Sequence, residues 1–448
     1  MATPILTVHS LSRRPRDAGV SDSMNGDTAA RAAAHAPTPD PAPTSLPYIR
    51  QGTAEFRRAS LALFASGFAT FGLLYCVQPL LPEFSKDFGV GAAGSALALS
   101  VSTGVLAVAM IFAGILSDRI GRRPVMAVSL LASSLLMLLV ALMHQWHAVL
   151  VLRTLLGLTL SGVPAVAMTW LAEEMDGASL GLGMGLYIGG NAVGGMSGRL
   201  IAGVVADYWG WRAGVATVGC IGLLATAVFW SRLPPSRHFV PRRPDLRALP
   251  ASFAELFRDA GLPWLFAVGF VLLGVFVTMY NYLGYHLLAP PYRLSQTVVG
   301  LIFTVYLIGS FSSAWMGQLA GRIGRGRVLG ISLGLILAGV ALLALPSLWV
   351  MALGITLVTF GFFGGHSVAS SWVGSRGGRH RAEASALYLF GYYLGSSVAG
   401  ALGGVFYTSR GWAGVCAFGA VLALAGLGLA WRLSRLRSAH PVTMPAAG

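Results

Sequence analysis

The sequence predicts an all-α membrane protein whose twelve transmembrane helices form two pseudo-symmetric six-helix bundles. Three observations lead to this prediction: the composition is strongly apolar, the basic residues fall in alternate loops, and the two halves of the chain repeat. Of the 448 residues, 55% are hydrophobic and 10% are charged, and the mean hydropathy is +0.70. Soluble domains carry about 25% charged residues, so most of this surface is expected to face lipid.

Twelve apolar segments are each long enough to cross a bilayer, which takes roughly 20 residues. The expected spans are 59–80, 94–116, 124–143, 147–171, 180–206, 211–231, 262–287, 294–319, 327–346, 348–373, 382–407 and 411–431. They predict bundles at 56–231 and 262–432, joined by a polar cytoplasmic linker at 232–261. The tail at 1–55 is rich in Ala, Pro, Thr and Asp, so we expect it to be disordered, and a second tail follows at 433–448.

The basic residues predict how the chain lies in the membrane. Twenty-one arginines, from Arg50 to Arg437, fall in one set of alternate loops and in the tail segments next to the first and last spans, whereas the other loops hold Lys86, Arg212, Arg293 and Arg410. Loops on the cytoplasmic side are enriched in Lys and Arg. The asymmetry therefore predicts an even number of spans with both termini in the cytoplasm. It also accounts for the net charge of +15 without a nucleic-acid partner, because the arginines lie in short clusters between apolar segments.

The two halves of the chain repeat at a spacing near 202 residues. Residues 114–122 match 317–325, in the loop after the second span of each half. Further matches pair Val166, Ala167 and Trp170 with Val368, Ala369 and Trp372, and Leu186, Tyr187, Gly190, Gly194 and Gly203 with Leu387, Tyr388, Gly391, Gly395 and Gly404. Two homologous bundles around a site at the middle of the membrane are suited to alternating access.

Three motifs carry a resemblance to a known family. The sequence Gly-Ile-Leu-Ser-Asp-Arg-Ile-Gly-Arg-Arg-Pro-Val-Met at 114–126 resembles the signature loop of the major facilitator superfamily. Arg-Thr-Leu-Leu-Gly at 153–157 resembles the second motif of its drug:proton antiporter branch. Gly-Asn-Ala-Val-Gly-Gly at 190–195 resembles the antiporter motif, with Asn191 where that pattern carries proline. The resemblance covers 55–435, implies the major facilitator fold, and is closest to a bacterial inner-membrane subgroup near the drug-efflux branch.

In that family the signature loop latches a gate on the cytoplasmic side. The resemblance assigns this gating motif to Gly114, Asp118, Arg119, Gly121, Arg122 and Arg123. Asp118 is expected near the start of the eleventh span, with Arg119 and Arg122 as its charge partners. The two glycines are expected to allow a close backbone approach and a tight turn. Possible counter-ions in the next loop are Glu173, Glu174 and Asp176. In the alternative interpretation, the arginines only anchor the topology.

Ionisable residues inside the spans are candidates for coupling, because burying them in hydrocarbon is costly. Arg153 and Arg199 are two of these, and the alternative for both is to extend to the outer interface. Arg153 falls on a motif that the resemblance links to proton coupling. His366, which replaces Pro164 in the repeat, can titrate near neutral pH, and its alternative is a hydrogen-bonded packing role.

The acidic residues leave the coupling mechanism open. All sixteen Asp and Glu residues lie in tails, in loops or at span ends. We therefore expect protons to use His366 or an acid at the rim, such as Asp118 or Asp207, and an uncoupled protein is the remaining option. No cofactor beyond a proton gradient is expected. The three cysteines lie singly, so no metal site is predicted either.

Polar and aromatic residues within the spans predict a substrate cavity. The candidates are Gln78, Tyr187, Asn191, Tyr280, Asn281, Tyr388 and Tyr392. Together with two arginines they would suit an amphipathic substrate, including an anionic one, and the alternative for each is helix packing or an interfacial position. Glycines expected to serve close helix packing in the fifth span are Gly181, Gly185, Gly189 and Gly190.

These observations predict a monomeric secondary transporter, and no enzyme, in the bacterial inner membrane. The leading hypothesis is proton-coupled efflux of a small organic molecule. The alternative is an uptake symporter or facilitator for a metabolite such as an organic acid or sugar. An intramembrane enzyme is a remote third hypothesis, because it would need a nucleophile–base pair or a metal cluster inside the spans. A receptor-like scaffold is equally remote, because neither tail could fold into a sizeable module.

Overall fold

The computed structural model describes residues 47–241 and 249–436 of the chain. Within those two ranges the regular structure is helical, apart from one isolated parallel bridge between Ile49 and Met175. The predicted tails fall mostly outside, because residues 1–46 and 437–448 are not among those described. For the described chain, the predicted all-α fold is confirmed.

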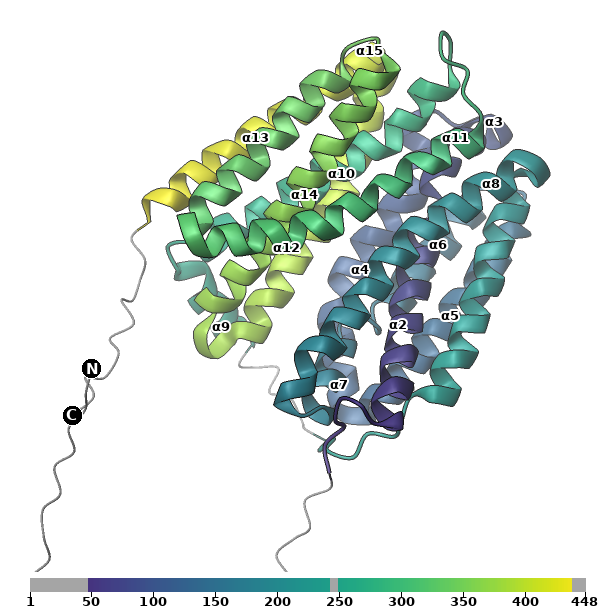
Figure 1. Ribbon diagram of the computed structural model, residues 1–448. Helices are drawn as coiled ribbons and strands as arrows, with labels where there is room; N and C mark the ends of the chain where they lie inside the picture. Colours follow the sequence, from purple (N-terminus) through teal and green to yellow (C-terminus); the bar gives the residue numbers. More distant parts are fainter. Residues whose placement is uncertain (1–46, 242–248, 437–448) are drawn as a thin grey trace, which may run out of the picture. The chain divides into compact units, whose positions relative to one another are not determined.

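The helices form two groups, coloured purple to teal and green to yellow in Figure 1. The first group comprises α2 (Ala54–Tyr75), η2 (Gln78–Leu80), α3 (Leu81–Phe88), α4 (Ala92–Ile120), α5 (Arg122–Ala141), α6 (Trp146–Leu160), α7 (Ala167–Glu174) and α8 (Gly177–Arg232). The second group comprises α10 (Leu262–Leu288), α11 (Gln296–Leu301), η3 (Ile302–Val305), α12 (Tyr306–Ile323), α13 (Arg325–Leu343), α14 (Leu348–Arg376), η4 (Gly378–His380) and α15 (Arg381–Arg435). Between the groups, the predicted linker contains a further helix, α9 (Leu249–Arg258).

Nine stretches of the described chain form helices long and apolar enough to cross a bilayer. The shorter α6 and its continuation α7 supply another span. Both α8 and α15 hold two spans, because each turns sharply at a glycine with a non-helical backbone, Gly210 (φ 79°) and Gly411 (φ 60°). A positive φ favours glycine at these turns. The described residues thus contain the twelve predicted spans in two sets of six.

Proline interrupts two spans that the sequence predicts to be continuous. The first span passes from α2 through η2 into α3, and Pro79 and Pro82 lie in the first turns of the two short helices. The fourth span, predicted at 147–171, breaks between α6 and α7 around Pro164. Proline lacks an N–H and clashes with the preceding turn, so a helix cannot run through unchanged.

The predicted disordered tail, 1–55, is too long at its C-terminal end, because Ile49 and Thr53 take part in the fold. Ile49 N donates to Glu174 O at 2.8 Å, and Asp176 N donates to Ile49 O at 3.2 Å. The Thr53 side chain accepts a hydrogen bond at the start of α2 and caps the helix. Composition alone did not reveal this order, because the residues that hold Ile49 lie far along the chain, at the end of α7.

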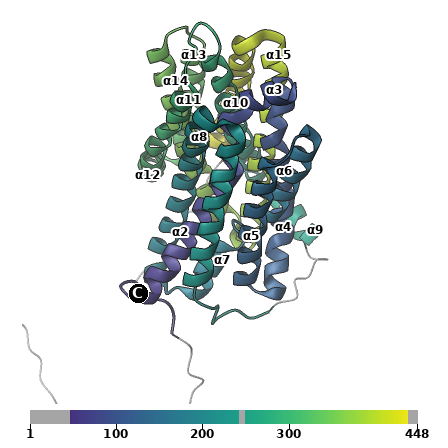
Figure 2. The same ribbon diagram turned by 90° about the vertical axis from the view of Figure 1, so that its right-hand side faces the viewer.

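Figures 1 and 2 both place α3 at one end of the helices and α7 and α9 at the other. We call the second end the arginine-rich end, because it carries Arg119 and Arg322 at the ends of α4 and α12, and Arg122 and Arg325 at the starts of α5 and α13. The end that holds α3 and the turn at Gly210 is called the opposite end.

The predicted repeat is visible in the backbone. Gly121 (φ 103°) and Gly324 (φ 95°) make equivalent turns after α4 and α12. Gly194 of α8 packs on Phe68 of α2, and Gly395 of α15 packs in the same way on Phe270 of α10. A Cβ added to either glycine would lie less than 3.0 Å from the backbone oxygen of that phenylalanine. Matching helix pairs therefore cross at matching glycines in the two halves.

The glycine positions in α8 differ from the prediction. An added Cβ at Gly181, Gly185 or Gly189 would meet no atom within 4 Å, whereas one at Gly190 would overlap the backbone of Phe64. Both sets of glycines follow helical spacing, so the sequence could not tell which face meets α2. Close packing is confirmed for Gly190 and is wrong for the other three.

We predict that Gly194→Ala lowers the thermal unfolding midpoint of the purified protein, because its methyl group would force α8 away from α2. Overpacking of this kind costs about 1–3 kcal/mol. Gly185→Ala is the matched control, since its methyl group meets open space and alanine favours the helix. Equal midpoints for the two variants would contradict the proposed role of this contact.

Candidate functional site

Hydrogen bonds join the two halves toward the opposite end. Tyr285 OH of α10 lies 2.5 Å from both Ser85 Oγ and Ser95 Oγ. Asp207 Oδ2 of α8 accepts from Thr297 N (3.2 Å) and Thr297 Oγ1 (2.6 Å) at the start of α11. Two further bonds run from Gln296 Nε2 to Pro79 O (2.7 Å) and from Ser397 Oγ to Ser100 O (2.7 Å). The coupling candidate Asp207 is therefore placed where the halves meet.

The arginine-rich end lacks such links. Among residues 47–241 and 249–436, no hydrogen bond or ion pair joins the first group of helices to the second group at this end. The ion pairs at this end instead lie within one half or join the linker to one half. The protein is thus held together at the opposite end and unlatched at the arginine-rich end.

The gating motif is centred on Arg122. Its Nη1 donates to Asp118 Oδ1 at 2.5 Å and to Ser117 Oγ at 2.7 Å, and its Nη2 donates to Glu173 Oε1 at 2.7 Å. The Phe239 ring lies 5.3 Å from the guanidinium carbon. Asp118 is therefore paired within its own half, and its predicted contact with the eleventh span is not made in this conformation.

The other motif residues have separate surroundings. Arg123 donates to Trp230 O at 2.8 Å, whereas Arg119 is exposed and forms no ion pair with a described residue. Gly121 makes the predicted turn. The prediction of a close backbone approach at Gly114 is wrong, because this residue lies inside α4 and an added Cβ would meet nothing within 4 Å.

The repeated turn of the second half has no matching acid. Gly321 occupies the place of Asp118, and Arg325, which corresponds to Arg122, donates to Ser375 Oγ instead of a carboxylate. Nearby, Asp259 accepts from Arg376 Nε at 2.5 Å. Burial acts to raise the pKa of Asp259, but this bond and two backbone N–H donors outweigh it, so the pKa lies below its ordinary value. The acid of the gating motif is therefore unique to the first half of the repeat.

The linker docks on the first half through Glu174, which the sequence suggested only as a counter-ion. This carboxylate is 1% exposed and accepts from Arg237 N (2.8 Å) and His238 N (3.0 Å). The His238 ring stacks on Tyr48 at 4.1 Å, and Arg237 Nη2 donates to Glu55 Oε1 at 2.6 Å. Sequence reasoning missed this docking, because the linker is simply polar.

Arg153 is buried, with an exposed fraction of 0%, so the alternative of extending to the interface is wrong. Its Nε donates to Ala98 O at 2.7 Å, and its Nη1 lies 3.8 Å from Met137 Sδ. Its Nη1 and Nη2 also donate to Leu73 O (3.0 Å) and Leu74 O (2.7 Å), close to the end of α2. Carbonyls at a helix end have no partner within the helix and carry partial negative charge. Arg153 therefore holds the break in the first span.

Arg199 is also buried, with 2% of its surface exposed, and lies between the halves. Its Nε donates to Gln78 Oε1 at 2.6 Å and its Nη1 to Gly195 O at 2.5 Å. The rings near its guanidinium carbon are Tyr75 at 4.4 Å, Tyr306 at 4.8 Å and Phe303 at 5.1 Å. Gln78 Nε2 in turn donates to Asn281 Oδ1 of α10 at 2.7 Å. Three predicted site residues from both halves thus meet here.

A second cluster of predicted residues lies in the second half. His366 Nδ1 is 2.9 Å from Tyr388 OH, and the His366 ring lies 4.6 Å from that of Tyr392. Phe362 stacks beside His366 and joins the cluster to the rings around Tyr280. Both His366 and Tyr392 keep part of their surface exposed.

Tyr280, Tyr187 and Asn191 remain from the predicted set. Tyr280 OH lies 2.8 Å from Thr359 Oγ1, and its ring stacks on Phe303 at 5.1 Å. Tyr187 OH and Asn191 Oδ1 are buried and have no hydrogen-bond partner among the described residues. Among the described residues, no hydrogen bond connects Tyr187 or Asn191 to the second half.

The described chain also contains groups that the sequence analysis missed. His286 lies in the last turn of α10 and stacks on Trp412 at 5.1 Å. The sequence could have revealed this residue, because it lies inside an apolar segment. The aromatic cage of Arg199 was not predicted, because nothing in the sequence aligns α2 and α8 with η3 and α12.

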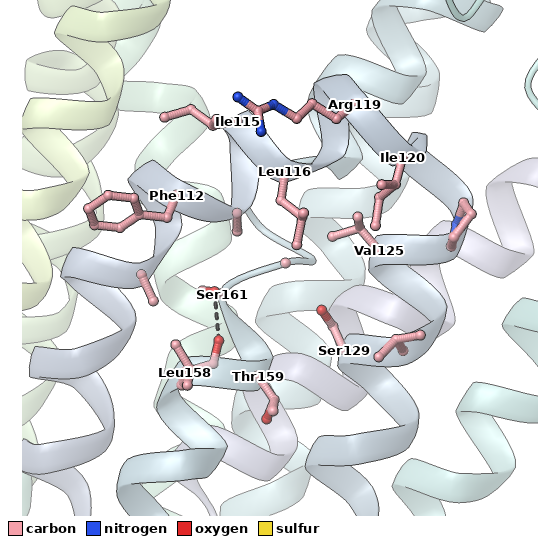
Figure 3. A pocket seen from close by; sticks show the side chains of 15 residues that line it. Phe112, Ile115, Leu116, Arg119, Ile120, Val125, Ser129, Leu158, Thr159 and Ser161 are labelled. Atoms are coloured by element: carbon pink, nitrogen blue, oxygen red, sulfur yellow. Dashed lines mark hydrogen bonds between the residues drawn. The ribbon is translucent and has the colours of Figure 1, made fainter. Parts of the chain in front are cut away.

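Two lateral grooves are apolar and contain none of the predicted cavity residues. One, of about 690 Å³, is lined by residues of α4, α5 and the end of α6, and Figure 3 shows Arg119 beside Leu116 and Ile120 at this groove. The other, of about 480 Å³, is lined by residues of α10, α11, η3 and α14. The polar clusters between the halves are therefore the better candidate for a specific site.

Known proteins share this sequence and arrangement. Residues 63–289 and 283–446 match the Major Facilitator Superfamily. Inner membrane transport protein YnfM of Escherichia coli K12 is 49% identical over 388 residues, covering 87% of this chain and 93% of that protein. MFS-type transporter YybF of Bacillus subtilis is 46% identical over 390 residues, covering 87% and 96%. A solved peptide transporter bound to alafosfalin superposes with a TM-score of 0.70 at 14% identity, covering 87% and 97%, which supports the fold alone.

We predict that Glu174→Ala releases the docked linker. The backbone amides of Arg237 and His238 should exchange with deuterium about tenfold faster or more, because hydrogen bonds to a charged group contribute about 1.5–3 kcal/mol. Glu173→Ala is the matched control, since its carboxylate holds Arg122 and no linker amide. Unchanged protection in Glu174→Ala, or equal loss in both variants, would contradict the assignment.

Proposed function

The chain belongs to the major facilitator superfamily, and from this premise we propose that it exports a small organic molecule from the cytoplasm by proton-coupled alternating access. Its family and close relatives are membrane transporters rather than enzymes. The direction, the coupling ion and the orientation of the termini belong to this proposal.

One observation carries the proposal: the halves are bonded at the opposite end and unlatched at the arginine-rich end. Arginine-rich loops favour the cytoplasmic side. We therefore assign the arginine-rich end to the cytoplasm, with both termini there. The site between the halves is then accessible first from the cytoplasm, where an exporter binds its cargo. The resemblance of 153–157 and 190–195 to antiporter motifs supports the same direction.

The site itself is suited to alternating access. Gln78 and Arg199 of the first half contact Asn281 and Tyr306 of the second half. These contacts must break when the opposite end opens. A cargo bound between the halves therefore has different partners in the two conformations, and that difference is what allows it to shift their equilibrium.

Proton coupling through His366, Asp118 or Asp207 is part of the proposal. His366 lies beside partly exposed Tyr392, and Asp207 accepts two hydrogen bonds across the halves. Protonating Asp207 would weaken this link and favour opening of the opposite end. An uptake symporter or facilitator for an organic acid or sugar is the competing function, and it would move its cargo in the other direction.

We predict gradient-dependent flux in inverted membrane vesicles given labelled benzoate, chloramphenicol and glucose as probes. His366→Gln should uncouple this flux from the pH gradient, because glutamine can hydrogen-bond to Tyr388 without titrating. Normal coupled flux in the variant would remove His366 from the mechanism. Uptake only into right-side-out cells would favour the competing function.

Asp118→Asn should slow transport about tenfold or more. The carboxylate is proposed to latch the arginine-rich end in the other conformation, where a charged hydrogen bond contributes about 1.5–3 kcal/mol. Glu255→Gln is the matched control, because its carboxylate lies at the same end, paired with Arg379 and outside the motif. Transport by Asp118→Asn at the wild-type rate would refute the latch.

A further inference from the structure

Arg199 is a buried cation without an acidic partner. It is 2% exposed, and no carboxylate of the described chain forms an ion pair with it. Isolated charges inside a membrane protein are costly, and they mark pathways for ions or substrates. No carboxylate of the described chain therefore balances the charge of Arg199.

Unused hydrogen-bond donors lie on Arg199 itself and on Tyr306 beside it, and a further one lies on Asn281, beyond Gln78. Arg199 Nη2 donates to no residue of the described ranges, whereas Nε and Nη1 each have an acceptor. Tyr306 OH and Asn281 Nδ2 are buried, and neither has a hydrogen-bond partner among the described residues. The Tyr306 ring lies 4.8 Å from the guanidinium carbon, and Asn281 is connected to it through Gln78. The site therefore offers donors to a ligand that brings acceptors.

Arg153 provides an internal comparison, because it is equally buried and also forms no ion pair with a described residue. Each of its guanidinium nitrogens has an acceptor, and all of these acceptors belong to the first half. Its hydrogen-bonding capacity is thus used by the fold. Burial alone therefore does not explain the free nitrogen of Arg199, which lies between the halves.

Aromatic rings continue from the cage of Arg199 into the second half. The Tyr280 ring lies 5.4 Å from that of Tyr306, and Phe276 stacks on Phe362 at 3.8 Å. The series ends at His366, whose ring is 6.2 Å from that of Phe362. Aromatic side chains favour offset stacking or edge contacts with another ring. These rings suit a planar apolar body whose charged end points to Arg199.

We propose that Arg199 and Tyr306 bind the carboxylate of a small aromatic carboxylic acid, and that such anions are the transported class. The transport role rests on the proposed function, whereas binding does not. A guanidinium matches the two oxygens of a carboxylate. The donors come from both halves, so the anion binds more tightly when the halves meet here. This difference in affinity is what coupling of binding to rocking requires.

The test measures the thermal unfolding midpoint of the purified full chain at neutral pH with benzoate, benzamide or benzylamine. These probes share one ring and differ in the charge of the attached group. Benzoate should raise the unfolding midpoint until the effect saturates with benzoate concentration. Benzamide and benzylamine should leave the midpoint unchanged. Arg199→Gln should weaken benzoate binding about tenfold or more, since a charged hydrogen bond is lost. Arg57→Gln, which removes an exposed arginine outside the gating motif, should bind as the wild type does.

Tyr306→Phe keeps the ring and removes only the hydroxyl, so it tests the site even if Arg199→Gln fails to fold. It should weaken benzoate binding several-fold. Equal stabilisation by benzamide or benzylamine, no stabilisation by benzoate, or wild-type binding by Tyr306→Phe would each overturn the proposal.

Transport separates the two proposals. Gradient-driven flux of chloramphenicol or glucose without flux of benzoate would refute aromatic carboxylic acids as the transported class. It would not contradict the proposed transport function. Arg199-dependent binding of benzoate with no gradient-driven flux of any probe would refute proton-coupled export and leave the binding site.

Discussion

The rest of the structure depends on the glycine contacts that bring α8 onto α2 and α15 onto α10. Lipid gives apolar helices little reason to associate, so close backbone packing and internal hydrogen bonds must hold each bundle together. Gly194 and Gly395 make that approach possible, because any side chain there would overlap a backbone oxygen. The contact also sets the position of Arg199. Arg199 lies just beyond Gly194 on α8, and the crossing with α2 points it toward Tyr75 and Gln78.

Two buried arginines in the first half show how the same residue type serves different purposes. Arg153 holds carbonyls near the break in the first span, so its charge belongs to the fold. Arg199 lies where the halves meet and keeps one nitrogen without a described partner. The ends of the bundles differ as well. Mostly uncharged hydrogen bonds join the halves at the opposite end, whereas Arg122 holds two acids inside one half at the arginine-rich end.

Much of the fold could be predicted from the sequence, because a duplicated helical bundle leaves a repeated pattern. The turns at Gly121 and Gly324 and the twelve spans follow from the repeat and from apolar length. The rotation of each helix about its own axis cannot be predicted from the repeat or from apolar length. Gly185 and Gly194 both fit a packing face, and only the partner helix decides between them. The sequence identified Gln78 and Asn281 as candidates for the substrate cavity. It could not predict their hydrogen bond, because this bond depends on how the halves meet. No pattern in the sequence predicts the docking of the linker on Glu174.

The proposed rocking of the two halves is tested most directly by distances between spin labels at both ends of one molecule. After Cys220→Ser, the pair Lys86→Cys and Ser409→Cys reports on the opposite end, and Arg58→Cys and Arg327→Cys reports on the arginine-rich end; all four positions are exposed. Under transport conditions, we predict a population in which the first distance lengthens while the second shortens. Distances that change together, or stay fixed during active transport, would contradict alternating access by rocking.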